Sequence, residues 1–400
     1  MQFNKINLFP YFQPIISIDN SLIYGYEILG RFLDVNNKVK SLGSFFTDSF
    51  ITNDKVLEVD KIIQEKGIKE FSLLARKNEK IFVNMRLDWL AEYANNPQDM
   101  PTILWADKYG VDYKNIIIEI TEEDVNASTN VYMTALSYYR NIGCKIAIDD
   151  YGCKNSNIYR LAELNPDIIK IDMSFIQKSE ELYQYRHYLK ILTEFASNMG
   201  IEVLYEGIEN SKQLLNCINS QGRFYQGFFL SKPLSTIEEA IFDKEAFRYC
   251  CQLAIITNQT VIGKNKSLQQ KMDKLIDNYF KDKPFEQSDL TIDEYIVGLC
   301  GIIPLYTIRM YVCNKYGFQI SSNIECGDCI NLSVDLYGRN CAWSGVFINA
   351  LKVINDNQFS FLTEVYRDVL LKEKIYTYVR ILDINNYLFI DISKSEMEKY

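Results

Sequence analysis

Residues 115–150 read NIIIEITEEDVNASTNVYMTALSYYRNIGCKIAIDD. Two short apolar runs, NIIIEI and KIAIDD, flank a longer amphipathic segment, VYMTALSYYRNIG, which ends in glycine as many helices do. We expect a strand, a helix and a second strand here. Repeats of such a unit build the parallel sheets of α/β folds.

The same alternation extends on both sides of this unit. Other strand-like runs are YFQPIISI, LIYGYEIL, KIFVNM, DIIKID, EVLYEG and RFYQGFFL, and QYRHYLKILTEFASNMG is a further helical segment. This order predicts a parallel (β/α) barrel or a doubly wound sheet. From about Thr236 to Phe280 the pattern is helical, which predicts a packed connector helix rather than a signalling coiled coil. Its apolar positions at helical spacing are Leu268, Met272, Leu275, Ile276 and Tyr279.

The pattern changes again from about residue 286. The runs TIRMYVCN and FQISSN, and then IYTYVRILD and YLFIDIS, flank short turns and predict antiparallel hairpins. A helix-like stretch, FLTEVYRDVLLK, lies between the two pairs. We therefore predict a barrel over residues 1–250, a connector helix over 251–285 and a smaller α+β domain over 286–400.

Composition narrows the class of protein. Hydrophobic residues make up 48% of the chain and charged residues 24%, which is typical of a folded globular protein. The net charge of −9 argues against binding of a nucleic acid polymer. No apolar run reaches the roughly 20 residues that span a bilayer, and MQFNKINLFP lacks the features of a signal peptide. We expect a cytoplasmic protein without a membrane span.

Histidine and cysteine usage limits the chemistry. His187 is the one histidine, which argues against zinc sites rich in histidine and against nucleophiles activated by histidine. The ten cysteines are scattered, which argues against a disulfide framework. Cys326 and Cys329, with Cys341 nearby, fit a loop with free thiols better than a zinc site, because no second pair at the usual spacing follows.

Polar residues end most of the strand-like runs in the first part. A single such residue is usually a helix cap or a loop residue, but the carboxyl ends of barrel strands meet at one face, so a series of them would converge. Clustered carboxylates repel one another unless cations neutralise them, and carboxylate and amide oxygens suit Mg²⁺ or Mn²⁺. We therefore predict a site for two divalent ions with a lysine beside it, formed from Glu27, Asn84, Glu119, Asp149, Asp150, Lys170, Glu206 and Gln226.

These motifs resemble those of the EAL-domain phosphodiesterases, which have a modified (β/α)8 TIM-type barrel and hydrolyse cyclic di-GMP to linear pGpG. The naming motif is present as Glu27-Ile28-Leu29. The resemblance covers about residues 10–235 and continues through FVNM, IIIEITE, IAIDDYG, DIIKIDMSFI, YEGIE and YQGFFLSKPL.

The resemblance implies a role for each matched position. Metal ligation falls to Glu27, Asn84, Glu119, Asp149 and Asp150. Catalytic roles fall to Glu27, Asp150, Lys170 and Glu206, of which the last two would orient or deprotonate the attacking water. Glu122 would steady the loop after the aspartate pair. Substrate contacts fall to Gln13, Leu29, Arg31, Asp172, Glu209 and Gln226.

One loop departs from the family pattern. Family members carry a sequence of the form DFGTGYSSL after the aspartate pair, whereas this chain reads DYGCKNSNI, with Cys153 and Lys154 at the altered positions. A catalytically weak or inactive receptor for cyclic di-GMP is therefore the alternative to an active hydrolase. A scaffold acting only through protein contacts would not require the full set of carboxylates. The resemblance also implies a homodimer.

The C-terminal domain resembles PAS-like or Cache-like sensor modules. Residues that are candidates to line a pocket for a small ligand are Trp343, Tyr366, Arg367, Asp368 and Asp391. We expect a small-molecule ligand or protein partner of this domain to regulate the barrel.

Overall fold

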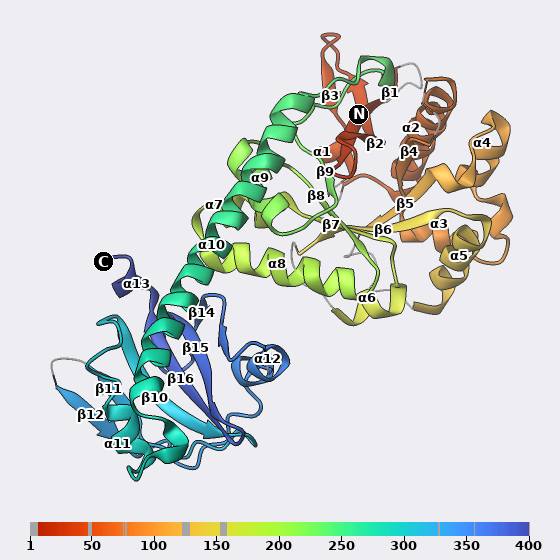
Figure 1. The fold of residues 1–400 in the computed structure, drawn as a ribbon. Coiled ribbons are helices and arrows are strands. Elements are labelled where there is room, and N and C mark those ends of the chain that lie inside the picture. Colours follow the sequence, from red (N-terminus) through yellow and green to blue (C-terminus); the bar gives the residue numbers. More distant parts are fainter. Residues whose placement is uncertain are drawn as a thin grey trace. The chain divides into compact units, whose positions relative to one another are not determined.

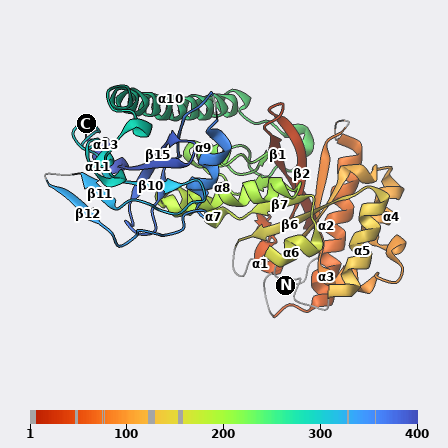
Figure 2. The same cartoon turned by 60° about the horizontal axis from the view of Figure 1, so that its bottom comes forward.

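The structure is a computed structural model that describes residues 7–46, 50–74, 76, 78–121, 129–152, 158–326, 329–355 and 357–399. The chain forms two compact units, Met1–Ile256 and Thr257–Tyr400. The helix α10 (Lys244–Asp282) runs without a break through the boundary between them (Figure 2). Among the described residues, no helix combines the length and the apolar content needed to cross a bilayer.

The first unit is a closed barrel (Figure 1). Neighbouring strands pair in the order β1-β9-β8-β7-β6-β5-β4-β2, and β1 pairs with β2 to close the ring, while β3 extends from β2 outside it. The strands are β1 (Leu8–Ser17), β2 (Leu22–Leu33), β3 (Val39–Ser41), β4 (Lys80–Asn84), β5 (Ile116–Thr121), β6 (Lys145–Tyr151), β7 (Ile168–Ile171), β8 (Glu202–Tyr205) and β9 (Phe224–Tyr225).

The ring differs from a barrel in which all strands are parallel, because β1 runs antiparallel to both of its neighbours, β2 and β9. All other neighbouring strands of the ring pair in parallel. The predicted barrel is thus confirmed, and the closure between β1 and β2 excludes the doubly wound sheet. Figure 1 shows the helices on the outer side of the strands. They are α1 (Gly43–Phe46), α2 (Asn53–Leu74), α3 (Leu87–Glu92), α4 (Pro101–Tyr109), α5 (Thr129–Ile142), α6 (Ile158–Leu164), α7 (Met173–Glu181), α8 (Tyr183–Asn198) and α9 (Ser211–Asn219).

Two separate cores hold the barrel together. A large cluster of buried apolar side chains lies between the strands and the surrounding helices, and includes Ile118 and Ile169. A smaller cluster fills the inside of the ring, and consists of Ile15, Phe82, Ile117, Ala147, Ile168, Leu204 and Phe224. Because successive side chains of a strand point to opposite faces, adjacent residues such as Ile168 and Ile169 belong to different cores.

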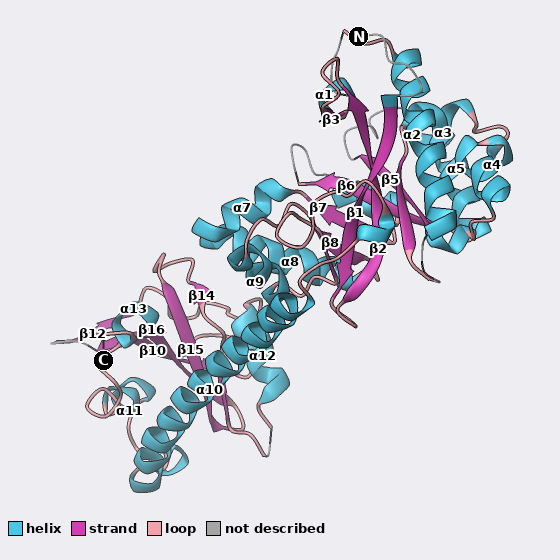
Figure 3. Cartoon of the chain, turned by 90° about the horizontal axis from the view of Figure 1, so that it is seen from above, coloured by secondary structure: helices cyan, strands magenta, loops and turns pink. Residues whose placement is uncertain are grey.

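The second unit is an antiparallel sheet with helices. Figure 3 shows its central strands side by side, and they pair in the order β12-β11-β10-β16-β15-β13, with β14 on β15. The strands are β10 (Thr307–Asn314), β11 (Asn323–Cys326), β12 (Ile330–Ser333), β13 (Ser360–Leu362), β14 (Tyr366–Arg367), β15 (Lys374–Asp383) and β16 (Asn386–Ser393). The helices besides α10 are α11 (Ile292–Val297), α12 (Gly345–Val353) and α13 (Lys394–Met397).

Each face of this sheet has its own core. Met272 and Ile276 of α10 pack with Met310 and Ile390 on one face, which confirms the predicted packing of the connector helix. On the other face Phe347 of α12 packs with Cys313, Val379 and Phe389.

Two expectations for the second unit need correction. The stretch FLTEVYRDVLLK is not a helix, because it contributes β13 and β14, whose backbone groups pair with β15. Asp368 then accepts hydrogen bonds from the backbone N–H groups of Leu370 and Leu371, which forms a turn instead of a further helical turn. The run FQISSN is not the second strand of the hairpin, because β11 begins only at its last residue, Asn323. The hairpin of β15 and β16 is confirmed.

Candidate functional site

The inner layer above the barrel core carries the predicted site residues. On the parallel strands each of these residues stands two positions after an inward core residue, as Glu119 does after Ile117 and Lys170 after Ile168. Because side chains alternate across a strand, both members of each pair point into the ring. The same relation holds for Asn84, Asp149, Glu206 and Gln226, which follow Phe82, Ala147, Leu204 and Phe224.

The antiparallel strand β1 reaches the same layer from the opposite direction. Gln13 stands two residues before the core residue Ile15 and lies directly opposite Glu27 of β2. Glu27 accepts a hydrogen bond from Gln226 Nε2 at 2.6 Å. The strand order therefore brings Gln13, Glu27 and Gln226 together across the point where the ring closes.

Lys170 lies at the centre of this layer and is completely buried. Its Nζ lies 2.5 Å from Glu119 Oε1, 2.6 Å from Glu206 Oε1 and 3.0 Å from Asp149 Oδ1. The oxygen Oε1 of Glu27 lies further away, at 3.7 Å. One ammonium group thus faces four carboxylates from four different strands or strand ends.

The buried charges shift one another's proton affinity. Burial raises the pKa of Glu119 and of Glu206 well above the usual value, although Lys170 acts in the opposite direction. Burial alone would lower the pKa of Lys170, but Asp149, Glu119, Glu206 and Glu27 outweigh it and raise that pKa well above the usual value. The upward shift of Lys170, which acts against its burial, indicates that the pocket holds more negative than positive charge.

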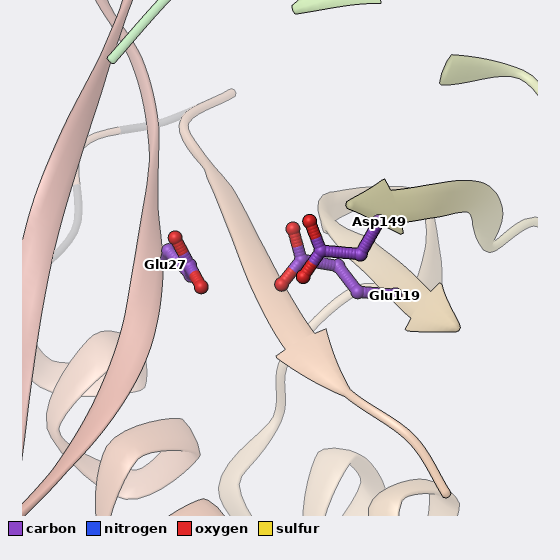
Figure 4. Close-up of side chains that lie close together, drawn as sticks. All are labelled: Glu27, Glu119 and Asp149. Atoms are coloured by element: carbon purple, nitrogen blue, oxygen red, sulfur yellow. The ribbon is translucent and has the colours of Figure 1, made fainter. Parts of the chain in front are cut away.

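The oxygens are arranged so that they fit divalent cations. One oxygen from each of Glu27, Glu119 and Asp149 lies within 4.8 Å of the others, and the same is true of Asp149, Asp150 and Glu206. Figure 4 shows the carboxylates of Glu119 and Asp149 next to each other and facing Glu27. Asp149 belongs to both sets, so the two sets fit two neighbouring ions that share one ligand.

Unpaired oxygens support this fit. Glu119 Oε2 and Gln226 Oε1 are buried and have no hydrogen-bond partner among the residues that the structure describes. A buried oxygen without a partner costs free energy, which a bound cation would remove for Glu119. The donor set therefore fits hard divalent ions, with oxygens as ligands and excess negative charge to be neutralised.

Asp150 has an unusual backbone for a non-glycine residue. Its φ is +54°, in the left-handed region, and its N–H donates to Asp149 Oδ1 at 2.9 Å. Burial and the charge of Asp149 raise the pKa of Asp150 to about 6. The strained backbone separates the directions of two adjacent carboxylates, so that Asp150 joins the set that includes Glu206.

A cavity of about 360 Å³ opens on one side of the carboxylates. Its walls include Leu29 and Arg31, two of the predicted substrate contacts, together with Asn84, Asp149 and Asp150. Residues that the sequence did not point to also line it, namely Phe46, Asp60, Ile63, Gln64, Arg86 and Thr121.

Gln64 joins the helix α2 to the site. Its Nε2 donates to the backbone oxygen of Asn84 at 2.7 Å and to Asp60 Oδ2 at 3.0 Å. Burial raises the pKa of Asp60 to about 7. The sequence contains a pattern that could have pointed to Asp60 and Gln64. An acid and an amide stand four positions apart on the apolar face of α2 formed by Val56, Val59 and Ile63.

A second cavity of about 220 Å³ opens on the other side. Gln13, Glu209 and Gln226, three further predicted substrate contacts, line it with Glu27 and Glu206. Met173, Gly207, Gly227 and Phe228 complete its walls. Gly207 has a φ of +63°, and a Cβ there would lie 2.3 Å from the Cβ of Met173, so this wall has no room for a larger residue.

The remaining predicted residues lie elsewhere. Asp172 lines neither cavity, and its side chain caps α7 by accepting a hydrogen bond from Ser174 N at 2.8 Å. Glu122, Cys153 and Lys154 lie outside the described residues.

The residues predicted to line a pocket in the second unit fall into two groups, one buried and one exposed. Arg309 Nε donates to Asp391 at 2.6 Å, and Thr377 bridges Asp391 to Tyr366, while Asp368 lies 3.3 Å from Arg309. Trp343 is 70% exposed and Arg367 is also exposed, so neither belongs to this buried network.

Two family models together match nearly the whole chain. One described as "EAL domain" matches residues 2–233, and one described as "EAL-domain associated signalling protein domain" matches residues 238–398. The uncharacterized EAL-domain containing protein YkuI of Bacillus subtilis is 28% identical over 398 residues, 98% of this chain and 96% of that protein. The crystal structure of YkuI, in complex with substrate c-di-GMP and calcium, gives a TM-score of 0.88 at 27% identity and covers 98% of both chains.

A protein named as a probable phosphodiesterase is also similar over the barrel. The probable cyclic di-GMP phosphodiesterase PdeB of Escherichia coli is 30% identical over 241 residues, which are 56% of this chain and 42% of PdeB. This chain therefore spans less than half the length of PdeB.

Proposed function

The chain belongs to the EAL-domain family and carries the EAL-associated signalling domain after its barrel, and from this premise we propose that it hydrolyses cyclic di-GMP to linear pGpG with two divalent ions. The observation that carries the proposal is the convergence of Glu27, Glu119, Asp149 and Glu206 around Lys170. Binding alone would not require this number of buried charges. The named activity of PdeB and the ligand of YkuI support the choice of substrate.

The site residues fall into two groups, those that would hold the ions and those that would orient a water molecule. Glu27, Asn84, Glu119, Asp149 and Asp150 would hold Mg²⁺ or Mn²⁺. The chemistry that two such ions supply is a more acidic water and compensation of the charge on the phosphate. Lys170 and Glu206, in contact at 2.6 Å, would orient that water, and Glu206 would accept its proton.

The two cavities suit the shape of a cyclic dinucleotide. The carboxylate cluster lies between them, since Asp149 and Asp150 border the larger cavity and Glu27 and Glu206 border the smaller one. A ligand with phosphates at its centre and a base at each end would place one base against Leu29, Ile63 and Phe46. The other base would lie near Phe228, and Arg31 would contact a phosphate.

The test is hydrolysis by the full chain. Cyclic di-GMP is incubated with Mg²⁺ or Mn²⁺, and linear product is separated by chromatography. We expect product with either ion, none in excess chelator, and a loss of at least about a hundredfold in rate for Glu27→Ala, because a ligand of the ions is removed. Glu194→Ala, which removes an exposed carboxylate on α8, is the matched control and should leave the rate unchanged.

A receptor is the competing function. The complex of YkuI shows that a similar protein holds the intact dinucleotide, which favours a test of binding beside turnover. Binding without linear product, unaffected by Glu27→Ala, would contradict the hydrolase and support the receptor.

We also propose how the protein is regulated, where it is located and how it assembles. We propose a cytoplasmic homodimer in which a PAS-like domain over residues 286–400 binds a small molecule or a protein partner, and the connector of residues 251–285 transmits the signal. Turnover by the full chain and by a chain ending at residue 250, compared in the presence of cell extract metabolites, tests this scheme. Equal rates throughout would argue against it.

A further inference from the structure

The second unit contains three cysteines whose positions point to chemistry that the barrel does not explain. Cys300 and Cys326 form a disulfide with a Cα–Cα distance of 5.6 Å. Cys329, three residues after Cys326, is exposed and has a free thiol. The bond corrects the expectation that Cys326 lies in a loop with free thiols, whereas Cys329 does carry a free thiol.

The disulfide ties two elements of the unit together. Cys300 follows the helix α11, and Cys326 is the last residue of β11. A second tie joins the same two regions, because Ser322, just before β11, donates from its N and its Oγ to Asp293 of α11 at 2.9 and 2.6 Å. The bond closes a loop of 26 residues that contains β10.

The hairpin geometry brings Cys329 close to the disulfide. Cys326 lies directly opposite Ile330 in the antiparallel pair of β11 and β12, and Cys329 is the residue before Ile330. Opposed residues in such a pair have Cα atoms about 4.5–5.5 Å apart, so Cys329 is at most one residue further from Cys326. Two cysteines with two residues between them form the spacing of many reversible disulfides.

We infer that Cys300, Cys326 and Cys329 form a thiol–disulfide exchange site, in which Cys329 attacks the Cys300–Cys326 bond. The thiolate sulfur of Cys329 bonds to Sγ of Cys326, and the bond between Cys326 and Cys300 breaks. The electron pair leaves on Cys300, which takes up the proton that Cys329 had lost. No atom is oxidised overall, so the step needs no further reagent.

The exchange alters what the bond holds. A link between residues 26 positions apart is replaced by one between residues three positions apart, within a single hairpin. Cys300 and the end of α11 are then held to β11 through Asp293 and Ser322 alone among the described polar contacts between them. The class of molecule that this site would meet is a low-molecular-weight thiol or disulfide, which reaches the exposed Cys329.

Peptide mapping of the full chain tests the inference. The protein is equilibrated with mixtures of reduced and oxidised glutathione, quenched with acid, alkylated with N-ethylmaleimide and analysed by mass spectrometry without reduction. We expect two linked species, Cys300–Cys326 with alkylated Cys329, and Cys326–Cys329 with alkylated Cys300. At about 0.1 mM glutathione, Cys329→Ser should slow the appearance of alkylated Cys300 by about tenfold, because a neighbouring thiol acts at a millimolar effective concentration.

Controls fix the interpretation. Cys300→Ser should leave only the Cys326–Cys329 link, and Cys251→Ala, at a half-buried thiol of α10, should leave the wild-type distribution unchanged. The inference is overturned if wild-type protein shows only the Cys300–Cys326 link at every ratio, or if no link forms under oxidising conditions. These measurements on wild-type protein do not depend on any variant folding, nor on the proposed hydrolysis.

Discussion

Lys170 is the residue on which the charge of the candidate site depends. Among the residues that the structure describes, its ammonium is the positive group within 4 Å of Glu27, Glu119, Asp149 and Glu206, and all of these side chains are at least four-fifths buried. Removing one partner of a buried ion pair leaves the other charges uncompensated, which costs more than the pair itself contributed.

Lys170→Met should therefore lose about 3–5 kcal/mol of the free energy of unfolding in chelator, where no ion replaces the ammonium. Mg²⁺ or Mn²⁺ should restore part of this loss. Urea unfolding with and without the ions measures both effects, and Lys212→Met, at an exposed lysine of α9, is the control. Wild-type stability of Lys170→Met in chelator would contradict the central role of this charge.

Asp60 gives a pH-dependent prediction at the same scale. Burial raises its pKa from 3.8 to about 7, so the folded protein keeps a proton on Asp60 that the unfolded chain releases above about pH 4. The unfolded state then binds fewer protons, and the free energy of unfolding falls as the pH rises from about 4 to about 7. The loss is roughly 4 kcal/mol at most, because each tenfold difference in proton affinity between the two states corresponds to about 1.4 kcal/mol.

Asp60→Asn removes this titration, so its stability relative to wild type should increase across that pH range and level off above it. Urea unfolding of both proteins at four pH values between about 4.5 and 7.5 measures the difference. A constant difference would mean that Asp60 does not titrate in this way. Asp99→Asn, at an exposed aspartate, controls for the loss of a carboxylate.

At the residue scale, the sequence predicts the site residues on the strands but misses the polar site residues on the helix α2. The inward positions of Glu119 and Lys170 follow from a two-residue period that is visible in IIIEI and DIIKI. Asp60 and Gln64 lie on a helix, and their polarity on its buried face makes sense only once β4 and the backbone of Asn84 are placed against it.

At the scale of elements, α10 contributes side chains to the core on one face of the sheet in the second unit. Met272 is completely buried and packs in the cluster that contains Ile276, Met310 and Ile390. Met272→Ala should cost about 2–5 kcal/mol because it leaves a cavity in a packed core. Hydrogen exchange should accelerate in peptides from β10, β15 and β16 and remain unchanged in peptides from β5 and β6.

The exposed neighbour Lys274→Ala is the control for that variant and should change neither group of peptides. Equal acceleration in β5 and β6 would show that the two units do not unfold separately.

The stretch FLTEVYRDVLLK shows why one element was misjudged. Its apolar residues have helical spacing, but Leu362 pairs with Tyr378 and Tyr366 with Ile375 of β15. Thr363 also accepts a hydrogen bond from the N–H of Thr377 at 2.9 Å. These partners are further apart in sequence than one helical turn. Pairing with β15 therefore overrides the helical spacing of the apolar residues, and a prediction from this stretch alone cannot detect that pairing.

For the whole molecule, closure of the barrel decides where the ions would bind. The alternation of strands and helices left a doubly wound sheet open as an alternative, because closure depends on how the first strand pairs. Only with β1 between β2 and β9 do Gln13, Glu27 and Gln226 meet across the seam.

Ion binding should accordingly stabilise the barrel unit and not the second unit. A ligand at a hundred times its dissociation constant adds about 2.7 kcal/mol to the state that binds it. Saturating Mn²⁺ should slow hydrogen exchange in barrel peptides around β5, β6 and β7 and leave peptides of the sheet β10–β16 unchanged. Asp149→Asn, which removes the ligand shared by both carboxylate sets, should abolish the effect. Slowing of similar size in both units would contradict this assignment.

The reversed first strand has a practical consequence for anyone who produces the protein. In the parallel strands the chain reaches the site at the carboxyl end, but β1 starts at that end, with Leu8 opposite Phe32 and Phe9 opposite Arg31. An affinity tag or fluorescent protein fused ahead of β1 would therefore join the described chain at the mouth of the barrel, on the side of Arg31. We expect such a fusion to slow ligand entry, so the tag belongs after the second unit or should be cleaved before assay.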